Sequence, residues 1–287
     1  SVVMMSLDVV FNFFLIFHTR TVDVLGMHIT MPGAGLGVVG AAIGTASAEF
    51  VAASITMYIL CFRNKELSLK IDSGRFMPTW DVVKRALHIG LPMGIQQTIM
   101  TSAYIVTTII IAPLGTFAIA ANSFGIIVES LCYMPGYGVS DAATTLVGQS
   151  MGAGRYELMK RFAWLSVALG MGIMTVMGVV MYVGSPFAMA MMTPSEEVRQ
   201  LGVEVLRIEA FAEPMFGAAI ISYGVFVGAA KTIAPSVMNL ISMWGVRITL
   251  AALLAPSMGL KGVWLAMCLE LTFRGVIFLV KLTLWKR

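Results

Sequence analysis

The clearest shortage in this sequence is charge. Only 12% of its 287 residues are Asp, Glu, Lys or Arg, whereas 58% are hydrophobic and the mean hydropathy is +0.88. A soluble domain carries about 25% charged residues, and a chain of this length could not cover a water-facing surface with so few. The composition therefore excludes an ordinary soluble protein and indicates a chain whose exterior lies in a lipid bilayer.

Signatures of enzymes and of metal sites are also lacking. The cysteines Cys61, Cys132 and Cys268 are scattered within apolar segments, so they form neither a disulfide framework nor a metal-ligand set. No Gly-x4-Gly-Lys-Ser/Thr loop that would cradle a nucleotide occurs. We therefore expect no enzyme, no metal site and no bound cofactor, and the sequence suggests no obligate protein partner.

Long apolar runs are what the sequence does contain. A helix needs about 20 apolar residues to cross the hydrocarbon core of a bilayer. Eight stretches of roughly this length occur, near residues 2–17, 36–62, 86–112, 115–143, 162–187, 201–228, 233–255 and 261–281. They predict an all-α polytopic membrane protein with about eight transmembrane helices.

The basic residues indicate how these helices are oriented. Thirteen Lys and Arg residues lie in the C-terminal tail and in the connections that follow the second, fourth and sixth stretches, against three in the other connections. Cytoplasmic connections carry such an excess. We therefore expect residues 63–85 and the C-terminus to be cytoplasmic, in a bacterial-type inner (plasma) membrane. The same placement explains the pI of 9.0 without a nucleic-acid partner.

Several motifs resemble those of one family of transporters. They are "LGVVGAAIGTA" (36–46), "LPMGIQQ" (91–97), "ATTLVGQSMGAGR" (143–155), "GVFVGAAKTIAPSVMNLISMWGVRI" (224–248) and "GLKGVWLAMCLE" (259–270). Through them the chain resembles the multidrug and toxic compound extrusion (MATE) transporters, and it is similar to helices five to twelve of their twelve. The resemblance implies two six-helix lobes around a cavity that opens to each side in turn and expels organic cations or drugs in exchange for Na+ or H+.

The same resemblance predicts the domain organisation. Residues 1–62 would be the last two helices of the N-lobe, residues 63–85 the cytoplasmic inter-lobe linker, and residues 86–287 the six-helix C-lobe. A gapless overlay of residues 37–50 on residues 262–275 agrees with repeated halves, although a match this short also arises by chance.

Acidic residues inside the apolar stretches are the candidate functional groups, because a charge in the membrane is costly and needs a reason. Glu209 and Glu213 are four residues apart and are predicted to share a helix face, beside a helix break at Pro214. Glu129 lies in the middle of another stretch, before a break or kink expected at Pro135. We predict that Glu213, Glu209 and Glu129 bind the coupling cation or proton, or the substrate.

Ion pairing is the alternative role for these acids. Glu209 would then belong to a salt-bridge network with Glu204 and Arg207, and Glu129 would pair with Arg247. A structural pair or interface role is expected for Arg247 and Glu270.

The remaining polar candidates lie near one helix end. Asp141 and Gln149 are predicted to cap or bridge helix ends at the inner face. Gly148, Gly152 and Gly154 are predicted to allow close packing, and the last two to let the chain reverse in a short cytoplasmic turn.

Two other functions stay open from the sequence. A lipid-linked oligosaccharide flippase of the related superfamily would need a strongly basic cavity, but the apolar stretches hold more acids than arginines. A non-transporting fragment would result if the four helices that the resemblance places before this chain were absent from the natural protein.

Overall fold

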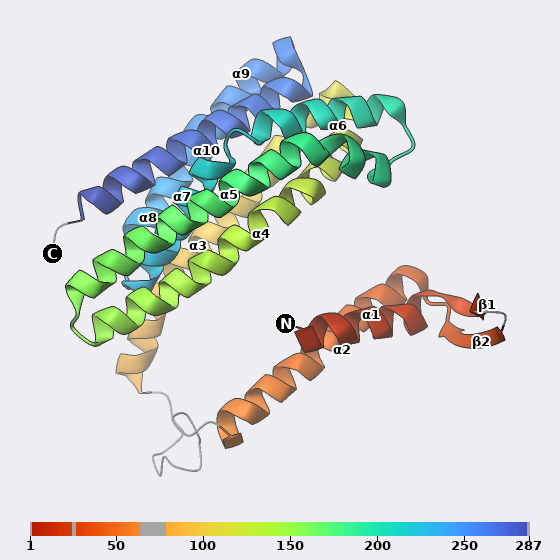
Figure 1. Ribbon diagram of the computed structural model, residues 1–287, viewed down its shortest axis with the longest axis horizontal. Helices are drawn as coiled ribbons and strands as arrows, with labels where there is room; N and C mark the ends of the chain where they lie inside the picture. The colour runs from red at the N-terminus through yellow and green to blue at the C-terminus, as the bar shows by residue number, and fades with distance from the viewer. Residues whose placement is uncertain (1, 25–26, 64–78, 286–287) are drawn as a thin grey trace. The chain divides into compact units, whose positions relative to one another are not determined.

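The computed structural model describes residues 2–24, 27–63 and 79–285, and these are helical apart from one β-hairpin (Figure 1). The chain divides into two compact units, Ser1–Pro78 and Thr79–Arg287. The division falls inside the predicted linker 63–85, most of which lies outside the described residues. The assignment of the units to two lobes stays a prediction.

The first unit is a pair of helices joined by the hairpin. Its elements are α1 (Val2–Ile16), β1 (His18–Val24), β2 (Met27–Ala34), α2 (Gly37–Tyr58) and the π-helix η1 (Ile59–Arg63). The helices approach closely at Gly40 and Gly44, where an added Cβ would collide with α1, as is usual for small residues between membrane helices. The antiparallel pairing of β1 with β2 was not predicted from the sequence.

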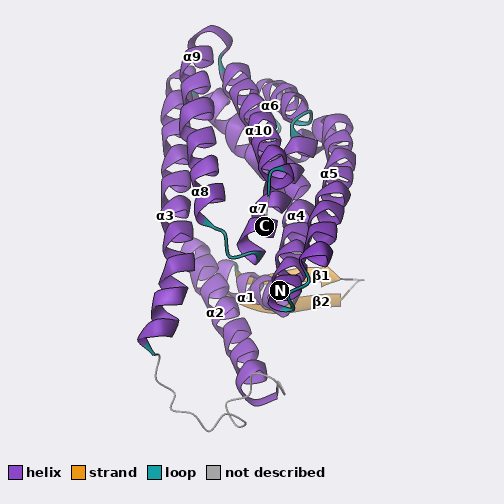
Figure 2. Cartoon of the chain, turned by 90° about the vertical axis from the view of Figure 1, so that its left-hand side faces the viewer, coloured by secondary structure: helices purple, strands orange, loops and turns teal. Residues whose placement is uncertain are grey.

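The second unit is a bundle of long helices. Its elements are α3 (Trp80–Ile111), the 3-10 turn η2 (Ala112–Leu114), α4 (Thr116–Gly152), α5 (Tyr156–Met192), α6 (Glu196–Glu209), α7 (Glu213–Gly228), α8 (Ile233–Leu240), the π-helix η3 (Ile241–Ile248), α9 (Thr249–Met258) and α10 (Leu260–Thr283). In Figure 2, α3, α8 and α9 stand on one side of this unit and α4 and α5 on the other. Helices α7 and α10 lie between them and contact each other.

The length and composition of the helices confirm the predicted fold class, an all-α polytopic membrane protein. Among the described residues, six helices are long and apolar enough to cross a bilayer, and α6 with α7 makes a seventh if the bent pair counts as one span. The eighth predicted stretch is helical too, but α1 has 15 residues, fewer than the roughly 20 that a perpendicular crossing needs.

Helix α7 is packed tightly against α4 in the middle of the bundle. The Ser140 hydroxyl donates a hydrogen bond to the Ile220 carbonyl oxygen at 3.0 Å, and the Thr144 hydroxyl donates to the Gly224 carbonyl oxygen at 2.9 Å. A Cβ on Gly224 or Gly228 would collide with α4. The glycines of α7 therefore serve close helix packing, and the Thr144 hydroxyl lies at 2.9 Å both from the Gly224 carbonyl oxygen of α7 and from the Ser140 carbonyl oxygen of α4 itself.

Two predicted breaks had different outcomes. The break beside Pro214 is present, since α6 and α7 are bent by 60° across residues 210–212. A proline ring collides with the carbonyl group four residues earlier, here that of Ala210. Pro135 was expected to break or kink its helix, and it does not break it, because α4 remains one helix from Thr116 to Gly152.

Candidate functional site

Four glutamates from four helices are buried inside the second unit. They are Glu129 of α4, Glu209 of α6, Glu213 of α7 and Glu270 of α10, exposed by 7%, 0%, 0% and 0%. Glu209 lies within electrostatic range of the other three and of Arg247. We call these four residues the buried acidic cluster. It brings together the three coupling residues predicted from the sequence and Glu270, for which a structural role was predicted.

Glu209 and Glu213 flank the break between α6 and α7. Glu209 is the last residue of α6 and Glu213 the first of α7, so the prediction that they share one helix face is wrong. Gly178 of α5 makes room for the break, since a Cβ there would lie 2.8 Å from the Ala210 carbonyl oxygen. The break thus places two carboxylates on either side of an interrupted backbone.

Neither of these two carboxylates is satisfied. All four of their oxygen atoms are buried, and no hydrogen-bond partner among the described residues reaches them. A carboxylate that is buried without a partner carries its charge only at high cost. Glu209 and Glu213 are therefore suited to hold a proton or a cation.

Glu270, in contrast, is fully engaged on one oxygen. Its Oε1 accepts hydrogen bonds from the Ser242 hydroxyl at 2.5 Å and from Arg274 Nε at 2.7 Å, and Arg274 Nη2 completes the ion pair. Glu270 and Arg274 are one helical turn apart on α10, so they approach readily. The structural role expected for Glu270 involves Arg274 rather than Arg247.

Arg247 lies on the π-helix η3 and has no carboxylate in salt-bridge contact among the described residues. Its Nη1 lies 3.8 Å from the Met243 sulfur, its guanidinium carbon lies 5.8 Å from the centre of the Tyr104 ring, and its Nε has no partner. Arg247 and Glu129 nevertheless line the same cavity of about 250 Å³. Glu129 is therefore near a cation but is not clamped by it.

The alternative salt-bridge network of Glu209 is absent from the described residues. Glu204 pairs instead with Lys261 at 2.8 Å. Arg207 stacks on the Tyr182 ring at 5.2 Å and donates to the Tyr182 carbonyl oxygen. Neither charged neighbour on α6 reaches the Glu209 carboxylate.

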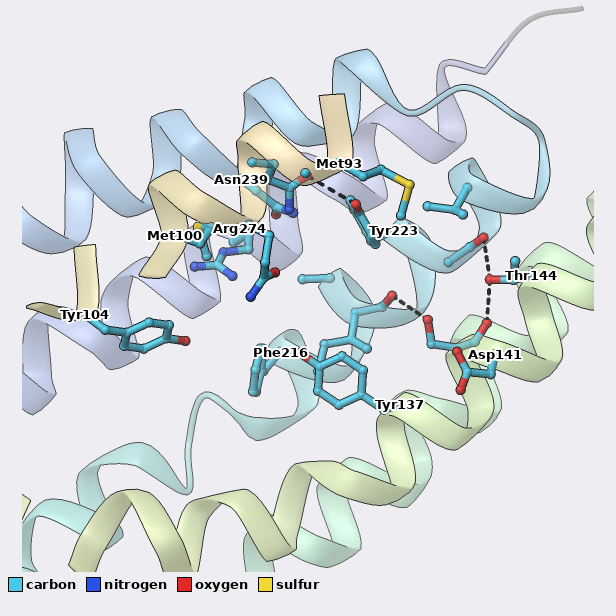
Figure 3. A pocket seen from close by; sticks show the side chains of 18 residues that line it. Met93, Met100, Tyr104, Tyr137, Asp141, Thr144, Phe216, Tyr223, Asn239 and Arg274 are labelled. Carbon is cyan, nitrogen blue, oxygen red and sulfur yellow. Dashed lines mark hydrogen bonds between the residues drawn. The ribbon is translucent and has the colours of Figure 1, made fainter. Parts of the chain in front are cut away.

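A larger cavity of about 610 Å³ lies between α3, α4, α7, α8 and α10 (Figure 3). Its lining combines aromatic, sulfur-containing and polar side chains, among them Met93, Gln96, Met100, Tyr104, Tyr137, Asp141, Thr144, Phe216, Tyr223, Asn239 and Arg274. Tyr223 donates a hydrogen bond to Gln96 Oε1 at 3.1 Å across it. The two cavities share Tyr104, Tyr137, Phe216 and Arg274, whereas Glu209 and Glu213 line neither.

Asp141 lies away from any helix end, whereas Gln149 lies in the last turn of α4, where its carbonyl oxygen accepts a hydrogen bond from the Ala153 N–H at 3.0 Å. The sequence placed them at the end of a helix, but α4 continues for about three more turns beyond Asp141, to Gly152. The exposed side chain of Asp141 lines the larger cavity, a role that sequence reasoning missed. Tyr137, four residues earlier on the same face of α4, was the available signal.

The three candidate glycines near the turn between α4 and α5 have separate roles. A Cβ on Gly148 would lie 3.4 Å from the Gly228 carbonyl oxygen, so Gly148 does sit at a close helix contact. Gly152 has nothing within 4 Å, and close packing is not its role. Gly154 has φ +69° and reverses the chain between α4 and α5, a conformation that glycine adopts without strain.

The fold and the candidate site together define the class of this protein. It is a polytopic helical membrane protein whose bundle encloses ionisable groups and cavities. A model of the MatE family matches residues 92–253, more than half of the chain. The chain therefore belongs to the MatE family, the multidrug and toxic compound extrusion transporters that its motifs resemble. The match is to a family of transport proteins rather than to enzymes.

Individual relatives agree with this assignment. The chain is 30% identical over 243 residues to the probable multidrug resistance protein NorM of Xylella fastidiosa, covering 84% of this chain and 52% of the relative. It is 27% identical to the protein of the same name from Thermotoga maritima, over 85% of this chain and 53% of the relative.

Solved structures share the fold. A crystal structure of MATE in complex with MaL6 superimposes with a TM-score of 0.85 at 18% identity, covering 98% of this chain and 60% of that chain. A transporter of the MOP superfamily from Pyrococcus furiosus, whose binding pocket is described as reversed in polarity, gives a TM-score of 0.78 at 18% identity over 87% of this chain and 56% of that chain. The present chain thus spans about half the length of the curated relatives that it matches.

Proposed function

We propose that the full-length protein is an ion-coupled exporter of organic cations and drugs, which works by alternating access in the inner (plasma) membrane. The observation that carries the proposal is that two buried carboxylates at a helix break, those of Glu209 and Glu213, have no hydrogen-bond partner among the residues that the structure describes. The multidrug resistance proteins among its relatives support the choice of substrate.

Na+ or H+ would act as the coupling ion at the buried acidic cluster. Binding of a cation or a proton removes the cost of a buried negative charge, and an ion that binds one conformation better than the other shifts their populations. Glu209 and Glu213 lie at the break, where the regular helical hydrogen bonding between α6 and α7 is already interrupted. Glu129 contributes from the smaller cavity beside Arg247.

Export that depends on an ion gradient is the expected activity. In cells that express the full-length protein, Glu213→Gln should abolish the acceleration of ethidium efflux by an imposed inward Na+ or H+ gradient, because a neutral amide neither exchanges a proton nor attracts a cation. Fluorescence of intracellular ethidium measures the efflux.

Glu204→Gln is the matched control, since Glu204 lies on α6 at a half-exposed ion pair with Lys261. This variant should retain the acceleration. If Glu213→Gln and Glu209→Gln both kept full gradient dependence, the coupling role of these residues would be refuted.

A lipid-linked oligosaccharide flippase is less well supported. Such a substrate carries phosphate groups and requires unpaired cations in the cavity. The cation of the larger cavity, Arg274, is already engaged by Glu270, which weighs against this alternative.

A further inference from the structure

The larger cavity holds one carboxylate that nothing in the described chain neutralises. Asp141 lies within the membrane span Thr116–Gly152, and its exposed side chain lines this cavity. No hydrogen bond or ion pair engages its carboxylate among the described residues. Charged residues within a span usually face a polar interior or a water-filled cavity, and Asp141 fits that rule.

The net charge of the cavity is negative. Arg274 is the basic residue of its lining, but its guanidinium forms an ion pair with Glu270, which lies outside the lining and is fully buried. Asp141 therefore contributes the uncompensated charge. A ligand that enters here meets one unpaired carboxylate and no free guanidinium.

Aromatic rings line the same cavity as this carboxylate. Asp141 and Tyr137 lie side by side at one edge of the cavity, and Phe216 lies beside Tyr137, while Arg274 and Met100 lie across the cavity (Figure 3). Ring faces attract cations, and polarisable methionines such as Met93 and Met100 adapt to varied apolar shapes. A volume of about 610 Å³ is typical of sites for drug-sized molecules.

We propose that Asp141 sets the charge selectivity of this cavity, by binding the cationic centre of an aromatic monocation beside the Tyr137 ring. A dication would leave one of its charges without a counter-charge inside the cavity, which is costly. The proposal rests on the proposed exporter function and deepens it. It also separates the substrate contact, Asp141, from the coupling residues Glu209 and Glu213.

The test compares the binding of two dyes that share one ring system. Ethidium carries one positive charge and propidium carries two. With the purified full-length protein, fluorescence polarisation should show ethidium binding more tightly than propidium. Asp141→Asn should weaken ethidium binding about tenfold or more, as expected for the loss of a charge-assisted contact, and should abolish the preference between the dyes.

Two further variants control the test. Asp141→Glu should restore most of the affinity because the charge is kept. Asp81→Asn removes the same chemical group from an exposed position in the first turn of α3, outside both cavities, and should leave binding unchanged. Equal ethidium affinity of the native protein and Asp141→Asn would overturn the proposal, as would equal loss in Asp81→Asn.

Efflux measurements distinguish this result from a failure of the proposed function. If the native protein exports ethidium with gradient dependence while Asp141→Asn binds it normally, only the present inference fails. If the native protein exports no ethidium under any gradient, the proposed function fails first. Asp141→Asn should keep the gradient dependence of its remaining efflux, because the buried acidic cluster is intact.

Discussion

Glu270 and Glu204 each pair with a cation, but in opposite surroundings. Glu270 and Arg274 have side chains exposed by 0% and 9%, whereas Glu204 and Lys261 are exposed by 51% and 45%. Removing one partner of a buried pair leaves an uncompensated charge that costs about 3–5 kcal/mol. An exposed pair contributes about 0–1 kcal/mol.

Glu270→Gln should therefore lower the free energy of unfolding of the full-length protein by several kcal/mol, because Arg274 then stays buried without a counter-charge. Denaturant unfolding in detergent micelles measures this change. Glu204→Gln is the matched control and should change the same quantity by less than about 1 kcal/mol. Similar losses in the two variants would show that burial does not govern the strength of these pairs.

The residue scale is also where prediction from the sequence was weakest. Intramembrane acids could be identified because charge is rare in apolar stretches, and the predicted set included every member of the buried acidic cluster. Their partners could not be identified. Glu270 meets Ser242 of another helix, and Glu209 meets no partner within the described part of the chain, because contacts between helices depend on how each helix is rotated about its axis.

At the scale of the element, the break between α6 and α7 depends on a glycine in another helix. Gly178 of α5 faces the Ala210 carbonyl oxygen at the break, whereas Gly172 of the same helix has nothing within 4 Å of an added Cβ. Both glycines lie inside a helix, where replacement by alanine favours helix formation by about 0.5–1 kcal/mol.

Gly178→Ala should nevertheless destabilise the protein, by about 1–3 kcal/mol, because the new methyl group forces backbone displacement in a packed interior. Thermal unfolding of the full-length protein in detergent measures the effect. Gly172→Ala should be neutral or slightly stabilising in the same assay. A stabilised Gly178→Ala variant would indicate that the break can relax without cost.

Helix breaks predicted from the sequence were correct where the local chemistry of a residue determines the backbone. Pro214 predicted the break beside Glu213, because its ring excludes a regular helix. Pro135 predicted another break or a kink, and no break is present, since α4 accommodates this residue within one continuous helix. Helix-breaking residues are tolerated in membrane helices whose neighbours compensate for the lost hydrogen bond.

At the scale of the whole molecule, the orientation in the membrane is a prediction from the basic residues. The turn between α4 and α5 should be cytoplasmic, and the turn between α5 and α6 should lie on the opposite side. Glu157 and Glu197 are exposed positions beside these two turns.

Single-cysteine labelling of the full-length protein in cells tests this orientation, after its native cysteines are replaced. Glu197→Cys should react with a membrane-impermeant maleimide in intact cells, and Glu157→Cys only after permeabilisation. The reverse pattern would invert the assigned orientation, and the proposed direction of transport would then have to be reassigned.

Composition and the spacing of apolar runs by themselves determined the class of this protein. A chain with 12% charged residues and repeated apolar runs has a low-energy exterior only in a bilayer, where apolar runs of about 20 residues are typical of spanning helices. Motifs such as "ATTLVGQSMGAGR" and "SMWGVRI" were enough to indicate the family, because they are local in the chain. The intramembrane acids could be named for the same reason.

Only the tertiary structure decided what these acids face. Glu209 and Glu213 lie on different helices because of the break, Glu270 pairs with Arg274, and Asp141 lines the larger cavity instead of capping a helix. Two of these outcomes depend on packing between segments distant in sequence, since Gly178 of α5 makes room for the break and Asp141 lines a cavity together with residues of α3, α7, α8 and α10. Glu270 and Arg274 are neighbours on α10. Periodicity says that a side chain lies on a helix, but packing between helices determines whether it meets a partner, a cavity or neither.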